Sequence, residues 1–113
     1  MKKDTAPGDW IATREMLCVL PDGSELIARA AVGRPYDTGE GDWACPVELS
    51  GLYGRHPDVP GVDSVQALCL ALSFLRTELE RFLEDGGKIL DPEDRSVWSR
   101  QGIATTFGGV GPL

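Results

Sequence analysis

The sequence predicts an α+β fold, in which a three- to four-stranded antiparallel sheet is followed by one long helix packed on one face. Two observations carry this prediction. Short segments in the first half of the chain are rich in β-branched residues or alternate apolar and polar residues, as half-buried strands do. Residues 62–87 instead repeat apolar residues at steps of three and four, which is typical of an amphipathic helix. Together these elements form one two-layer domain.

The first two strands are predicted to form a hairpin. Residues 10–20 (WIATREMLCVL) are rich in bulky and β-branched side chains and end at Pro21. The sequence PDGS at 21–24 is a strong turn signal, and residues 25–33 (ELIARAAVG) follow it directly. That segment also contains good helix formers, but its short spacing from the turn and the stop after Gly33 favour a strand.

A third strand is predicted at 43–50, after a polar loop at 34–41 that is rich in Gly and Pro. Its inward face is expected to carry Trp43, Cys45, Val47 and Leu49. Pro46 has no backbone N–H, so this strand is expected to be an edge strand or to contain a bulge. Residues 52–53 suggest a short fourth strand, and residues 55–61 (RHPDVPG) read as a loop.

The strongest signal is a helix over 63–85. Asp63 is a good N-cap residue with Gln66 three positions later, and Gly86 suits the position after the helix. The predicted apolar ridge consists of Val65, Leu68, Leu72, Leu75, Leu79 and Phe82. Every residue from 67 to 72 is apolar, so the first half must be covered on most sides. Either the sheet and its loops cover it, or Leu70 and Phe74 form an interface.

The rest of the chain divides around this helix. Residues 88–90 (KIL) are predicted to form a final short strand, and Asp91 with Pro92 to start a helical turn. We expect a flexible N-terminus at 1–9 and an α+β domain at 10–90. Residues 91–113 then form the helical turn and an extended or disordered tail, because glycine is frequent there.

Composition excludes several functions. The net charge is −7, with 18 acidic against 11 basic residues, which disfavours nucleic acid and anionic membranes as partners. Three cysteines without a CxxC spacing argue against a disulfide framework and suit a reducing compartment. The N-terminus lacks the apolar core of a secretory signal, and no segment is apolar enough to span a membrane. A cytoplasmic protein is therefore expected.

No catalytic, metal or cofactor site is predicted. His56 is the only histidine, and a thiol enzyme would have to pair it with the core-facing Cys45. A zinc site needs three or four paired ligands, which the scattered cysteines do not offer. The candidate binding residues are instead aromatic or lie off the helix ridge, and they are Trp43, Tyr53, His56, Leu70, Phe74 and Trp98. Trp98 lies among polar residues and is expected to be exposed or to dock a partner.

Several motifs resemble a family of small bacterial proteins that is known only as a domain of unknown function. They are IATRE at 11–15, DGSE at 22–25, DWACP at 42–46 and GVDSVQALCLAL at 61–72. The resemblance covers residues 10–85 and implies the fold described above and a bacterial origin. It implies no activity and carries over no catalytic residues.

Three functions stay open at this point. A non-catalytic module that binds another protein, or a second copy of itself as a homodimer, is favoured, with a toxin-neutralising immunity protein as its specific form. The alternative is a small-molecule sensor or carrier with a helix–sheet pocket near Trp43, Tyr53 and His56. The third is a hydrolase that uses His56 with a carboxylate, which requires the two groups within about 3 Å of each other.

Overall fold

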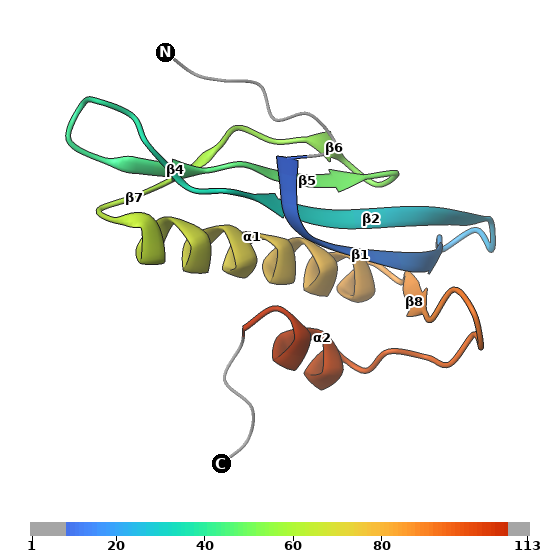
Figure 1. Ribbon diagram of the computed structural model, residues 1–113. Coiled ribbons are helices and arrows are strands. Elements are labelled where there is room, and N and C mark those ends of the chain that lie inside the picture. Colours follow the sequence, from blue (N-terminus) through green and yellow to red (C-terminus); the bar gives the residue numbers. More distant parts are fainter. Residues whose placement is uncertain (1–8, 109–113) are drawn as a thin grey trace.

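The computed structural model describes residues 9–108 and confirms the α+β class (Figure 1). The larger sheet has the strand order β6-β5-β2-β1-β8 and the smaller one β3-β4-β7, all antiparallel. The larger sheet consists of β1 (Trp10–Val19), β2 (Glu25–Gly33), β5 (Val47–Ser50), β6 (Gly54–Arg55) and β8 (Lys88–Leu90). The smaller sheet consists of β3 (Tyr36–Asp37), β4 (Trp43–Cys45) and β7 (Val59–Gly61). The predicted hairpin and third strand correspond to β1, β2, β4 and β5. The structure adds the short strands β3, β6 and β7, so the β layer consists of two sheets.

The predicted hairpin is formed by β1 and β2, which pair from Trp10↔Gly33 to Val19↔Glu25. Its turn closes through two backbone hydrogen bonds, from Gly23 N to Leu20 O and from Leu20 N to Ser24 O, each 2.8 Å long. Gly23 has a φ of 91°, a conformation that glycine adopts without steric cost. The PDGS signal thus fixes the register of the two longest strands.

The predicted strand at 43–50 is divided at Pro46 into β4 and β5, which belong to different sheets. The irregularity expected at Pro46 is therefore the point where the chain changes sheets. Gly33 donates its N–H to the Pro46 carbonyl at 2.9 Å, and a Cβ on Gly33 would lie 2.9 Å from the Pro46 ring. The predicted strand at 52–53 is wrong, because those residues form the turn into β6, and residues 59–61 form β7 where a loop was expected.

Helix α1 (Ser64–Glu84) confirms the main prediction, with Asp63 as N-cap. The Asp63 carboxylate accepts a hydrogen bond from Gln66 N, and the Gln66 side chain accepts one from Val62 N, each 2.8 Å long. The helix packs against β4, β7, β2, β5 and β8. Its N-terminal half lies close to Gly61 at the end of β7. A Cβ on Gly61 would lie only 2.5 Å from the Ala67 nitrogen.

This close approach shifts the buried stripe of α1 from the predicted leucine ridge. The fully buried residues are Ala67, Ala71, Leu75, Leu79 and Phe82. Leu68 and Leu72 are only half-buried, because the small alanines occupy the contact with β4 and β7 and move these leucines to one flank. Val65 is exposed. The ridge prediction is therefore correct for Leu75, Leu79 and Phe82 and correct in part for Leu68 and Leu72, which pack against the core, and it is wrong for Val65.

The C-terminal segment is more ordered than the sequence predicts. Residues 88–90 form β8 as expected, but residues 92–94 form a turn in which the Asp91 carboxylate accepts hydrogen bonds from Glu93 N and Asp94 N. Helix α2 (Arg100–Thr106) occupies part of the tail that was predicted to be extended. Its Ile103 is fully buried, and Phe107, directly after it, is also buried. The predictions for residues 1–8 and 109–113 lie outside the described residues.

Candidate functional site

The predicted binding residues are divided among three places. Tyr53, His56, Leu70 and Phe74 gather on one flank of α1. The His56 ring lies 4.6 Å from Phe74 and 6.2 Å from Tyr53, measured between ring centroids, and both contacts are edge-to-face. Leu70 lies one helical turn before Phe74 and is 44% exposed. Of these residues, Leu70 and Tyr53 present the most surface to solvent.

The contacts of His56 are with the aromatic rings of Tyr53 and Phe74. The Nε2 atom of His56 is buried and has no hydrogen-bond partner within residues 9–108. No described carboxylate or thiol is hydrogen-bonded to this histidine.

The buried thiols are poor nucleophiles. Burial raises the pKa of both Cys18 and Cys45 from 9.0 to about 11, so both stay protonated at neutral pH. The Cys45 thiol donates to the Gly33 carbonyl at 3.4 Å, as expected for a packed core residue. Cys69 is exposed on α1.

A polar network joins the small sheet to β6. The Tyr36 hydroxyl donates to one Asp58 oxygen at 2.5 Å, and Arg55 pairs with the other at 3.2 Å. The Asp58 side chain is only 5% exposed. Burial, followed by the hydrogen bond to Asp58, raises the pKa of Tyr36 to about 12. Arg55 also lies over the Trp10 ring, 5.4 Å from its centroid. Each of these groups has a partner among the described residues, and together they connect β3, β6 and Trp10 of β1.

Trp43 and Trp98 lie apart from the aromatic cluster. Trp43 is half-buried against the core, as its place on the inward face predicts. Trp98 is less exposed than expected, because its indole is half-buried against the core and lies under Arg14, and its docking to a partner stays a prediction. The Arg14 guanidinium carbon is 4.6 Å from the ring centroid, which is a cation–π contact. This pair joins β1 to the segment before α2.

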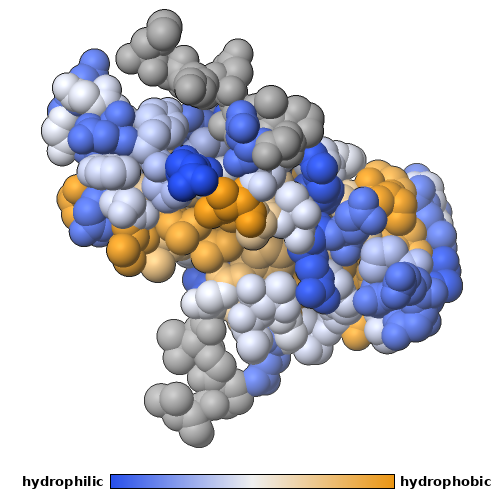
Figure 2. Space-filling view, in the orientation of Figure 1, coloured by the Kyte–Doolittle hydropathy of each residue, from blue (hydrophilic) through white to orange (hydrophobic). Residues whose placement is uncertain are grey.

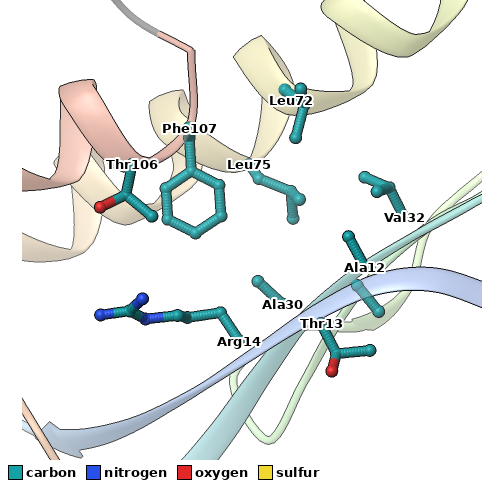
Figure 3. A pocket seen from close by; sticks show the side chains of 10 residues that line it. Ala12, Thr13, Arg14, Ala30, Val32, Leu72, Leu75, Thr106 and Phe107 are labelled. Carbon is teal, nitrogen blue, oxygen red and sulfur yellow. The ribbon is translucent and has the colours of Figure 1, made fainter.

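Beside Arg14 lies a cleft of about 230 Å³ between β1, β2, α1 and the end of α2 (Figure 3). Its apolar walls include Ala12, Ala30, Val32, Leu72, Leu75 and Phe107. Arg14 and Thr106 supply polar groups to its lining (Figure 3). Leu72 and Phe74 lie on opposite sides of the buried stripe of α1, so this cleft is on the other flank of the helix from the pocket that the sequence predicts near His56.

The walls of the cleft come from segments that are distant in the sequence, so no local pattern predicts it. Phe107 was assigned to an extended tail, and Arg14 was treated only as a strand residue. One local signal is present in β1. The polar residues Thr13, Arg14 and Glu15 all lie in IATRE, whereas MLCV contains only apolar residues. Such a change within one strand indicates that only part of the strand is covered.

Apolar side chains also remain in solvent along the first half of α1. Val65 is 69% exposed, and Val62, just before the helix, is 72% exposed. Figure 2 shows an apolar surface that follows these first turns and continues toward β1. Exposed apolar surface of this kind commonly marks a contact with another molecule when it is contiguous.

The described residues contain neither a metal-binding cluster nor a membrane-spanning helix. Within residues 9–108 no group of three or more metal-binding side chains comes together. Neither α1 nor α2 has the length and apolar character that a membrane-spanning helix requires.

Comparison with known proteins gives a family and no activity. No curated protein and no solved structure matches the chain. A family model described as a domain of unknown function, DUF6968, matches residues 12–99, which include β1 from Ala12 onward, all the other strands and all of α1. The matched part is most of the chain, and the chain therefore belongs to the DUF6968 family.

Proposed function

We propose that this protein is a non-catalytic module that binds another protein, or a second copy of itself, through the apolar surface along the first half of α1. The observation that carries the proposal is the exposure of Val62 and Val65 at this end of the molecule. Leu70 is exposed as well, but it lies five residues after Val65 and therefore faces about 140° away around the helix, on the flank of Phe74. Burying such side chains against a partner contributes roughly 25 cal/mol per Å² of apolar surface. The second half of α1 has no exposed apolar side chains of this kind among the described residues, because its exposed positions, Thr77, Arg81 and Glu84, are polar.

Charge favours a partner with a basic surface. The chain carries 18 acidic and 11 basic residues, and such an imbalance speeds association with a basic protein and disfavours acidic ones. An immunity-type inhibitor of a basic toxin is the specific form of the proposal that agrees with this charge.

The size of the cleft favours protein binding over transport of a small molecule. Ligand pockets commonly have volumes of about 300–1,000 Å³ and enclose most of the ligand. The cleft beside Arg14 measures about 230 Å³ and opens at the surface, so it suits a side chain of a partner better than a complete ligand.

Site-specific photo-crosslinking tests the proposal. A photo-reactive amino acid is placed at position 65 or 70 in cells that express the protein, with position 93 as a control, because Glu93 is exposed in a polar turn. We expect a discrete adduct from 65 and 70 and none from 93. The adduct from position 65 should be lost when Val62→Asp is combined with that probe, because Val62 is the neighbouring exposed apolar side chain. Equal labelling from all three positions, or none, would contradict the proposal.

A further inference from the structure

We propose that the outer edge of β1 and the adjoining cleft bind an extended peptide, whose apolar side chain enters the cleft while a carboxylate two residues away pairs with Arg14. This inference rests on the proposed function and adds a second contact with the same partner, in which Arg14 takes one acidic residue of an otherwise basic protein. Three features support it: an open strand edge, an apolar pocket beside that edge, and a cation without a carboxylate partner among the described residues.

The first half of β1 has an open edge. β1 pairs with β2 along its length, but β8 covers only Leu17–Val19 on the other side. No other strand of the described residues pairs with this outer edge. Edges of this kind present unpaired N–H and C=O groups to any extended chain that approaches.

The direction of these groups follows from the hydrogen bonds of β8. Asp91 N donates to Ser96 O at 2.8 Å and Trp98 N donates to Ile89 O at 2.9 Å, both on the side of β8 that faces away from β1. Leu90 therefore directs its N–H and C=O toward its partner Leu17.

Because these directions alternate along a strand, Thr13 and Glu15 direct their N–H and C=O to the same outer edge as Leu17. The pairing of β1 with β2 is regular from Ala12 to Val19, so no bulge interrupts the alternation. A peptide would use these four backbone groups as the next strand of the sheet.

The cleft lies on one face of β1, and alternate side chains of an added strand would project from that same face. Ala12 and Arg14 lie on the same face of β1 and both line the cleft, as do Leu72 and Phe107. The side chain at Ala12 is small, so the space opposite it is left to the partner. In an added strand, the residues opposite Ala12 and Arg14 are two positions apart and share that face.

Arg14 supplies the charge. Four described arginines form ion pairs with carboxylates, as in Arg95 with Glu25 at 2.8 Å and Arg100 with Glu84 at 3.0 Å. Arg14 has no carboxylate partner among residues 9–108 and is held against Trp98 instead. A guanidinium positioned by an aromatic ring and left without an anion suits a carboxylate of the ligand.

The order of the two peptide residues depends on strand direction. An antiparallel strand passes Arg14 before Ala12, so its pattern is acid–x–apolar, and a parallel strand has the reverse pattern. Two fluorescein-labelled, acetylated and amidated decapeptides test both orders: SGTETLTVSG for the antiparallel strand and SGTLTETVSG for the parallel one. Binding to the full chain is measured by fluorescence anisotropy.

We expect one of the two peptides to bind, and about a tenfold or greater loss of affinity when its glutamate is replaced by glutamine or when the protein carries Arg14→Ala. N-methylation of the backbone amides that face β1 should abolish binding, while Arg95→Ala, a surface arginine elsewhere, should leave it unchanged. Arg14 is exposed, so Arg14→Ala is expected to fold, which circular dichroism checks.

Failure of both peptides at millimolar concentration would overturn this inference, as would binding that tolerates both Arg14→Ala and N-methylation. A dimer in sedimentation experiments that protects the Thr13 and Glu15 amides would also overturn it, since the edge would then belong to a second copy. Adducts from positions 65 and 70 would still support the proposed function in either case, so the two failures are distinguishable.

Discussion

Residues 16–19 of β1 and residues 11–15 of the same strand have different surroundings. Met16, Leu17 and Cys18 are buried, and residues 17–19 have a paired strand on each side. Residues 11–15 are exposed and pair with β2 alone. The facing helix repeats the contrast, because α2 packs on α1 and joins its C-terminal half through Arg100, while the N-terminal half leaves Val65 in solvent. The difference shows that the segment after α1 closes one end of the sheet and leaves the other end open.

The largest difference in stability is expected between Met16 and Thr13. Met16→Ala removes a fully buried side chain and should lower the free energy of unfolding by about 3 kcal/mol. Thr13→Ala changes an exposed side chain in the open half and should cost under about 0.5 kcal/mol. Urea denaturation of both variants measures the difference. Similar losses would show that the two halves of β1 are equally packed.

The next largest effect should come from α2. Ile103 is fully buried although it lies in a helix of only 7 residues. Ile103→Ala should lower the free energy of unfolding by about 2 kcal/mol, the lower end for such truncations, because a short terminal helix relaxes easily. Thr105→Ala, at an exposed position of the same helix, is the matched control. If both variants unfold at the same urea concentration, α2 does not hold the closed end together.

The open end of α1 depends on its cap. Asp63→Ala removes the acceptor of the Gln66 N–H and should cost about 1 kcal/mol. Asp63→Asn keeps an acceptor of equal capping strength and should stay within about 0.5 kcal/mol of the parent protein. Thermal denaturation followed by circular dichroism compares the two. A cost for Asn equal to that for Ala would mean that charge, and not the cap hydrogen bond, matters here.

The smallest effect is expected from labelling the thiols, which compares how accessible the three cysteines are. Iodoacetamide at pH 8 should modify the exposed Cys69 and leave Cys18 and Cys45 intact, because their pKa is about 11 and they are buried. Mass spectrometry of the labelled protein identifies the modified residue. Rapid modification of Cys18 would show that the closed half opens readily.

The same thiols give a pH dependence. Their folded pKa of about 11 exceeds the usual 9.0, so the folded protein holds these protons more tightly than the unfolded chain. Their contribution to stability is therefore complete below pH 9 and is lost as pH rises from 9 toward 11. Replacing both cysteines with alanine should flatten this part of the stability profile.

Local signals in the sequence predicted the parts of the fold that local interactions determine. The hairpin follows from the PDGS turn, and α1 begins after Asp63 because that side chain caps the helix directly. The division at Pro46 was expected as an irregularity, although its result, a change of sheet, depends on how β4 and β5 find different partners.

The parts that the sequence did not predict depend on contacts between distant residues. Helix α2 contains Gly102 and adjacent threonines, which are poor helix formers, and burial of Ile103 accompanies its formation. The buried stripe of α1 passes through Ala67 because Gly61 allows β7 to come close. The cleft and the contact between Arg14 and Trp98 require α2 to be in place, so a strand-by-strand reading could not find them.

Amide hydrogen exchange tests most directly the claim that β1 is open along its first half. Thr13, Glu15, Leu17 and Val19 all direct their N–H to the outer edge, and only the last two face β8. In exchange followed by NMR, Thr13 and Glu15 should exchange rapidly while Leu17 and Val19 are strongly protected. Equal, strong protection of all four amides in the monomeric protein would show that the edge is covered and would contradict the account.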